Sequence, residues 1–296
     1  MNKAAVFCLF LSATAGTALA QDTITTVSAG IGLGRANLKL VLGPPLGTLE
    51  STTDVFSASF TKSVVTNFTP TDTSGIITIG KCIVLPFTPP AGPNATITST
   101  FLNAGPVMNL TGPSGTKQIP ITRNVFSASL GGGAAFPGAP APAPLYLVAG
   151  MYTVDNGGGG ADIGPFSVSL TLPDPFVWTN PDDLTSIDRS GSIDVTWSGG
   201  DPNSKVQIGG AVLIMDPVTH QQTDGASFDC QEDDSAGHFT VGPDVLSLLP
   251  ASTTTNGVSN GGMVLINGVA TKFDLAGVDQ ANFVFNSIVS RSVEYK

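Results

Sequence analysis

Short runs of β-branched or alternating residues, separated by Gly, Pro, Asn and Asp, recur along this chain, and no helical period of useful length appears. Ile193, Val195 and Trp197 would share one face of an extended strand, with polar residues between them. Such a period of two predicts half-buried antiparallel strands, and many short strands of this kind predict an all-β sandwich protein. Strands are expected at 76–79, 82–85, 96–102, 107–110, 166–172, 192–197, 206–212, 239–241, 263–266 and from 283 onward.

Turn residues divide these runs. The chain has 35 Gly and 22 Pro, and Asn-Gly pairs at 156, 256, 260 and 267 are expected to form hairpin turns, because both residue types tolerate positive φ. One short helix is predicted at 244–249, since Pro243 suits a first helical turn and Pro250 would end it.

A domain boundary is predicted at 173–175, where two prolines would stop sheet pairing. The fold prediction is therefore two β-sandwich domains: an N-terminal β-rich domain at 21–175 and an immunoglobulin-like sandwich at 176–296. The pentapeptide Val-Phe-Ser-Ala-Ser occurs at 55–59 and again at 125–129. Either a duplicated β unit or chance reuse of a strand sequence would explain this repeat.

Residues 1–20 have the features of a secretory signal peptide. Lys3 precedes an apolar run at 4–15, and Ala-Leu-Ala at 18–20 fits a cleavage site that would leave Gln21 first. The run is too short to span a membrane, and no later stretch has 18 consecutive apolar residues. The sequence thus predicts a secreted protein, extracellular or periplasmic, without a transmembrane segment.

The charge balance argues against a nucleic-acid partner. Twelve Lys and Arg stand against 22 Asp and Glu, a net charge of −10, whereas nucleic-acid binding needs a basic surface to neutralise phosphates. Only 11% of residues are charged, so few ionisable groups are present for catalysis. An extracellular protein or a glycan is the expected kind of partner.

Cys82 and Cys230 would remain after removal of the leader, which contains Cys8. In an oxidising compartment these two residues could pair, and a bridge would then staple the two predicted domains together. The alternative is two buried thiols on separate strands. The spacing fits neither a C-x-x-C motif nor a zinc site.

Two groups of carboxylates are the candidates for a metal site. Asp229, Glu232, Asp233 and Asp234 form one group, for which extracellular calcium is the possible cofactor. A second group comprises Asp182, Asp183 and Asp188. Solvated acidic turns are the plainer explanation of both groups, and a glycosidase pair is a further alternative.

Motifs for catalysis match poorly. Residues 75–82 approach a phosphate-binding loop but end in Cys82, and 257–261 match G-x-S-x-G without a following acid and histidine. The two histidines, His220 and His238, lack a metal-ligand spacing, and 157–162 contain a single incomplete G-G-x-G-x-D repeat. We therefore predict no catalytic residues and no enzyme.

Aromatic residues bear on a sugar-binding alternative. The chain has two Trp and three Tyr, and Trp197 is expected in the core. Trp178 opens the second predicted domain and could pack at the domain junction, so few aromatic side chains remain for a sugar-binding platform. If the protein binds a sugar, exposed Tyr146 or Trp178 would make the contacts.

The second half of the chain contains, in order, the motifs GGADIGPF (159–166), WTN (178–180), IDR (187–189) and VTWSGG (195–200), followed by FDC (228–230), FTV (239–241) and LSLLP (246–250). Together with AGP (104–106) and LTGP (110–113), this string resembles a group of uncharacterised secreted β-rich proteins from soil bacteria of the acidobacterial type. The resemblance covers roughly 76–296 and implies no known activity. The resulting hypothesis is an exported, non-enzymatic structural or adhesive protein, with an extracellular carbohydrate- or ligand-binding module as the alternative.

Overall fold

The structure of the protein, a computed structural model, describes residues 23–43, 47–66, 76–86, 96–134, 141–216, 219, 222–255 and 257–296. The described residues are predominantly in β-strands, so the all-β prediction is confirmed. The expected leader at 1–20 and His220 lie outside these ranges.

Fourteen strands pair into one mixed sheet: β1 (Thr23–Gly43), β2 (Gly47–Thr66), β3 (Ile77–Ile79), β4 (Cys82–Pro86), β5 (Thr96–Phe101), β6 (Val107–Gly112), β7 (Gly115–Thr122), β8 (Val125–Ala134), β9 (Gly150–Asp155), β10 (Ser167–Leu172), β14 (Lys205–Met215), β15 (Gln222–Asp233), β19 (Gly261–Lys272) and β20 (Gln280–Ser292). The strand order is β10-β9-β6-β7-β8-β2-β1-β20-β19-β14-β15-β4-β3, and β5 also pairs with β2. Strand β1 runs antiparallel to β2 and parallel to β20.

Smaller elements complete the fold. One three-stranded sheet contains β11 (Asp174–Trp178), β13 (Ile193–Gly200) and β16 (His238–Val241), and two-stranded sheets contain β12 (Ser186–Ile187) with β21 (Glu294–Tyr295) and β17 (Thr254–Thr255) with β18 (Val258–Ser259). The helical segments are η1 (Pro181–Leu184), η2 (Asp234–Ala236) and α1 (Pro243–Leu246). No helix among the described residues is both long and apolar enough to span a membrane.

The longest strands owe their two different faces to a strict alternation. In β1, Ala29, Ile31 and Leu33 are buried, and glycines occupy the positions between them. In β2, the buried residues Phe56 and Phe60 alternate with small polar residues in the same way. Because successive side chains of a strand point to opposite faces, the central parts of β1 and β2 present large apolar side chains on one face and mostly small side chains on the other.

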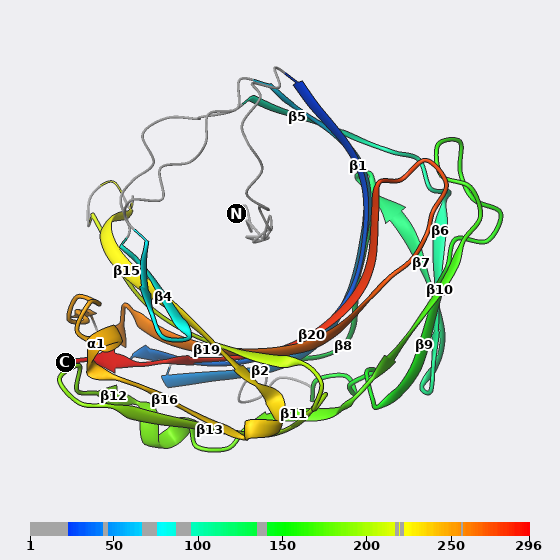
Figure 1. The fold of residues 1–296 in the computed structure, drawn as a ribbon. Helices are drawn as coiled ribbons and strands as arrows, with labels where there is room; N and C mark the ends of the chain where they lie inside the picture. Colours follow the sequence, from blue (N-terminus) through cyan, green and yellow to red (C-terminus); the bar gives the residue numbers. More distant parts are fainter. Residues whose placement is uncertain are drawn as a thin grey trace.

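Two hydrophobic cores lie on the outer side of the curved central strands (Figure 1). One core packs β1, β2 and β20 against β6, β9 and β10. The other packs β14, β15 and β19 against β11, β13, α1 and the C-terminal residues. The inner strands therefore form one continuous layer, and shorter strands cover its convex side.

The continuous layer combines strands from both sides of the predicted domain boundary at 173–175. Strand β1, from the first predicted domain, pairs with β20, from the second, over 28–39 and 280–291. Each core likewise draws residues from both halves, for example Phe283 in one and Val84 in the other. The domains at 21–175 and 176–296, and an immunoglobulin-like arrangement for the second, stay predictions.

The repeated pentapeptide forms one structural unit. Its two copies lie side by side on β2 and β8 and pair antiparallel, with Ser57 opposite Ser127 at the centre. Phe56 and Phe126 point into the same core, and the serines lie on the other face. The sequence Val-Phe-Ser-Ala-Ser thus pairs with its own copy.

Candidate functional site: the concave face of the curved sheet

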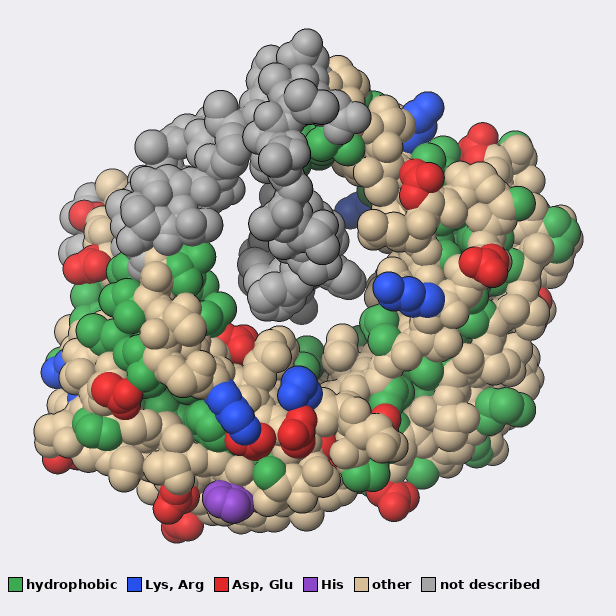
Figure 2. All heavy atoms as spheres, in the orientation of Figure 1, with side chains coloured by type: hydrophobic (Ala, Val, Ile, Leu, Met, Phe, Trp, Pro, Cys, Tyr) green, Lys and Arg blue, Asp and Glu red, His purple; other side chains and the backbone are tan. Residues whose placement is uncertain are grey.

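The inner face of the curved layer is built from residues that are distant in sequence. One row across it, defined by strand register, contains Ile83 on β4, Asp229 on β15, Gly209 on β14, Val264 on β19, Ser290 on β20 and Leu38 on β1. The curvature of these strands leaves a hollow on this side (Figure 2). We call this inner surface the concave face.

A cavity of about 590 Å³ occupies the part of the concave face between β4 and β1. Hydrophobic side chains gather on the wall formed by β4 and β15 in Figure 2. Leu85 on β4 and Leu213 on β14, the strand that pairs with β15, line this cavity and are 39% and 43% exposed, although both are large and apolar; we call this part of the lining the apolar wall. The apolar side chains that line the cavity include Leu40, Leu42, Ile83, Leu85, Leu213 and Val264.

A second cavity, of about 500 Å³, lies where β1, β2, β8 and β20 meet. Gly30, Gly32 and Ser57 line it together with the exposed ring of Phe101. A β-carbon added at Gly32 would lie 3.1 Å from the Ser57 hydroxyl oxygen, so a larger residue there would crowd the floor. Small residues therefore keep this end of the concave face open.

Asp229 lies on the concave face, at the floor of the first cavity. Burial raises the pKa of this carboxyl group above its ordinary value. No hydrogen bond or ion pair to another described residue reaches it. The remaining members of its predicted group have different surroundings.

Glu232 and Asp233 are each paired with a lysine. Lys81 Nζ lies 2.6 Å from Glu232, and Lys205 Nζ lies 2.8 Å from Asp233 Oδ1. These hydrogen bonds lower the pKa of both carboxyl groups. Asp234 is buried in η2, where desolvation raises its pKa and its Oδ1 has no hydrogen-bond partner.

The structure therefore separates the four carboxylates predicted as a calcium site. Strand alternation places Glu232 on the opposite face from Asp229, beside Val206. Within the described ranges, no group of three or more His, Cys, Asp or Glu side chains is arranged to hold a metal ion. The second acidic group is also dispersed: Asp182 pairs with Lys39 at 2.9 Å, and Asp188 accepts hydrogen bonds from Ser190.

Cys82 and Cys230 are joined by a disulfide, with their Cα atoms 4.0 Å apart. They lie directly opposite each other on β4 and β15, with both side chains in the core. The bridge therefore links neighbouring strands of one sheet. Of the two alternatives expected from the sequence, a bridge and two buried thiols, the structure contains the bridge.

Tyr146 and Trp178 are buried, which corrects their prediction as surface contacts for a sugar. Trp178 packs in the C-terminal core, and its indole Nε1 donates to Asn180 Oδ1 at 3.1 Å. Tyr146 packs beside Tyr152 in the other core. The remaining Trp and Tyr residues, Trp197 and Tyr295, are buried as well.

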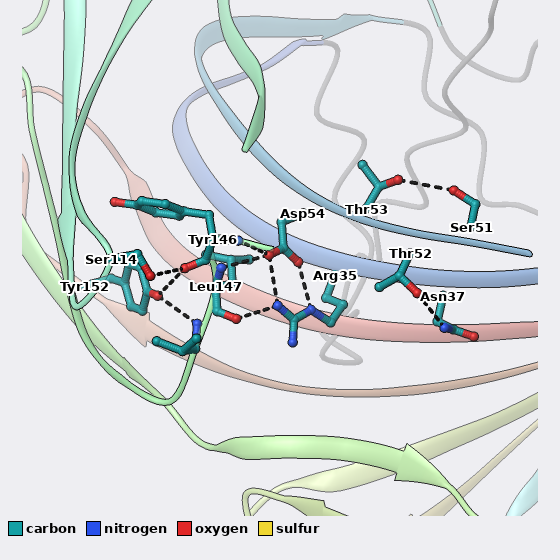
Figure 3. Close-up of polar contacts among 11 residues, drawn as sticks. Arg35, Asn37, Ser51, Thr52, Thr53, Asp54, Ser114, Tyr146, Leu147 and Tyr152 are labelled. Carbon is teal, nitrogen blue, oxygen red and sulfur yellow. Dashed lines mark hydrogen bonds and ion pairs between the residues drawn. The ribbon is translucent and has the colours of Figure 1, made fainter. Parts of the chain in front are cut away.

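The segment that carries Tyr146 is fixed by a polar network around the fully buried Asp54 (Figure 3). Arg35 Nε and Nη2 donate to the two carboxylate oxygens of Asp54 at 2.8 and 2.9 Å. The backbone N–H groups of Tyr146 and Leu147 donate to Asp54 Oδ2, each at 2.8 Å. Every contact in this network is internal, so its role is to hold residues 146–148 against β1 and β2.

The rejected catalytic motifs have structural roles. Ser259 of the G-x-S-x-G match donates its hydroxyl to the carbonyl oxygen of Val293 at 2.7 Å. Asp162 of the glycine-rich motif accepts a hydrogen bond from the backbone of Asn103. His238 is exposed, and its Nδ1 lies 3.1 Å from the carbonyl oxygen of Ala236.

No protein-family model matches the chain, and no curated protein matches it. Among solved structures, the chain is similar to a yeast delta-COP-I mu-homology domain at 6% sequence identity, covering 92% of this chain and 97% of that one, with a TM-score of 0.23.

Proposed function

We propose that this chain is an exported, non-enzymatic structural or adhesive protein whose binding surface is the concave face. The observation that carries the proposal is the apolar wall of that face, where Leu85 and Leu213 are exposed on strands that are fixed on their other side by a core. Contiguous exposed apolar surface of this kind typically marks an interaction site.

The build of the molecule supports a scaffold role. Long paired strands, a cross-strand disulfide and the Asp54 network hold the concave face rigidly from behind. A rigid surface loses little conformational entropy when it binds. Export through a leader at 1–20, an extracellular or periplasmic location, and an arrangement as two domains with an immunoglobulin-like second one are parts of the same proposal.

The second candidate is an extracellular ligand-binding module. Sugars are commonly bound by exposed aromatic rings, whereas the Tyr and Trp side chains here are buried. The apolar lining of the larger cavity favours a ligand with an apolar portion instead.

Two equally exposed leucines allow a matched test of the concave face. Leu85 lies on this face and Leu248 follows α1 on another side, and both are 39% exposed. We expect the wild-type chain to bind an alkyl-coated sensor surface. The Leu85→Asp variant should lose at least about fivefold in binding, and the Leu248→Asp variant should keep it.

Equal binding by both variants and the wild type would overturn the assignment of the surface. A non-enzymatic role is tested separately with a panel of ester, peptide and glycoside substrates. Hydrolysis that disappears in Asp182→Asn or Asp233→Asn would overturn it.

A further inference from the structure

Asp229 is the most unusual side chain of the concave face. Its cross-strand neighbours are Ile83 on β4 and Gly209 on β14, so one flank is apolar and the other has no side chain. Leu85, Leu213 and Val264 line the same cavity. A carboxylate thus lines an otherwise mostly apolar cavity, and the cavity volume of about 590 Å³ is large enough for a small ligand.

Three cationic side chains at this end of the sheet, within the described part of the chain, contact groups other than Asp229. Lys81 and Lys205 pair with Glu232 and Asp233. Arg291, the other charged residue at this cavity, donates from Nη1 to Asn37 Oδ1 and to the Ser290 carbonyl oxygen, both at 2.8 Å. The contacts that neutralise neighbouring carboxylates therefore do not extend to Asp229.

Placing a carboxylate in partly apolar surroundings without a partner costs free energy, and a structure can tolerate that cost where the group serves a ligand. The complementary group for a carboxylate is a cation, and the complementary group for the surrounding leucines is a hydrocarbon. The acidic chain as a whole, at net charge −10, would also attract a cation rather than an anion.

We propose that the concave face binds an amphiphilic amine, with the protonated nitrogen at Asp229 and the apolar portion against Leu85, Leu213 and Val264. This inference rests on the proposed function, because it assigns a ligand class to the same surface. In this proposal, Asp229 alone accounts for the preference for a cationic ligand, and Leu85, Leu213 and Val264 account for the binding of its apolar portion.

The test compares three probes with the same ten-carbon chain, namely decylammonium, decanol and decanoate, titrated into the full chain by calorimetry at neutral pH. We expect the wild-type protein to bind decylammonium at least about tenfold more tightly than decanol, and decanoate most weakly. The Asp229→Asn variant should bind decylammonium and decanol equally. The Asp233→Asn variant is the matched control, because this carboxylate lies on the same strand but is 62% exposed and paired with Lys205.

Retention of the decylammonium preference in Asp229→Asn would overturn the inference, and so would its loss in Asp233→Asn. If Asp229→Asn fails to fold, Ile83→Lys provides a second variant, because it places an ammonium group across from Asp229. That variant should abolish the preference for decylammonium and spare decanol binding. Decanol has no charge, so its binding tests the proposed function alone, and Leu85→Asp should weaken it. If the wild type does not bind decanol, the proposed binding surface is wrong. If it binds decanol and decylammonium equally, only the inference about Asp229 is wrong.

Discussion

The disulfide between Cys82 and Cys230 is the covalent anchor of one end of the sheet. Strand β4 attaches to the large sheet through β15, and β3 attaches through β4. Replacing both cysteines, as in the Cys82→Ala and Cys230→Ala double variant, removes the crosslink without leaving a free thiol. Both positions are buried, so alanine also suits their surroundings.

The size of the effect follows from the length of chain that the bridge closes. The cysteines are 148 residues apart, and the chain-entropy relation for a closed loop then gives about 17 cal/mol/K, or about 5 kcal/mol at 25 °C. Residual structure in the unfolded state lowers this value. We therefore expect the double variant to lose about 3–5 kcal/mol of unfolding free energy.

Urea unfolding of the wild type and the double variant, without reductant, measures this loss, and reduced wild-type protein should unfold like the variant. Amide exchange gives a local measurement: protection in β4, a short strand near the end of the sheet, should fall further than protection in β1, which pairs over a much longer stretch with β2 and β20. A loss below about 1 kcal/mol would refute the reasoning. Detection of two free thiols in the denatured, unreduced wild type would remove its premise.

Three further predictions concern carboxylates. Asp54→Ala should lose about 3–5 kcal/mol in urea unfolding, because Arg35 and two backbone N–H groups would lose a buried partner; a loss below about 1 kcal/mol would contradict this. Since burial raises the pKa of Asp229, the folded state binds its proton more tightly than the unfolded state, so this residue costs stability increasingly as pH rises through and above the ordinary value of 3.8. Asp229→Asn should therefore have a higher melting temperature than the wild type at pH about 7 and an equal one at pH about 3; equal values at both would contradict the assignment. Millimolar calcium should leave the melting temperature unchanged, because Asp229 and Glu232 lie on opposite faces of β15, and a rise reversed by chelator would contradict this.

The sequence predicted the class of fold and ten of the strands after residue 76, because those strands alternate apolar and polar residues or are β-branched; β7 and β15 are among the strands that it missed. It did not predict the two longest strands, β1 and β2. In β1 the residues between Ile31 and its buried neighbours are glycines, which are depleted in strands and conceal the period of two. Tertiary pairing on both sides overrides this weak local preference.

One predicted hairpin turn was wrong for a related reason. Asn267 and Gly268 lie inside β19. Asn267 is buried and donates from Nδ2 to Ser204 Oγ at 2.8 Å, so its side chain completes a tertiary contact. The helix predicted at 244–249 forms in part, at Pro243–Leu246, where Pro243 provides a local start signal.

The concave face could not be predicted because it depends on register between distant strands. Sequence proximity grouped Asp229 with Glu232, Asp233 and Asp234, yet side-chain alternation sends Asp229 and Glu232 to opposite faces. The true neighbours of Asp229 are Ile83, 146 positions earlier, and Gly209. A shift of β4 by one residue against β15 would turn Ile83 and Leu85 into the core and would separate Cys82 from Cys230, whereas Asp229 would stay on the concave face because β15 also pairs with β14. The disulfide therefore holds the register that places Ile83 and Leu85 on the concave face beside Asp229, and loss of the bridge should weaken both the stability of β4 and the apolar contribution to ligand binding.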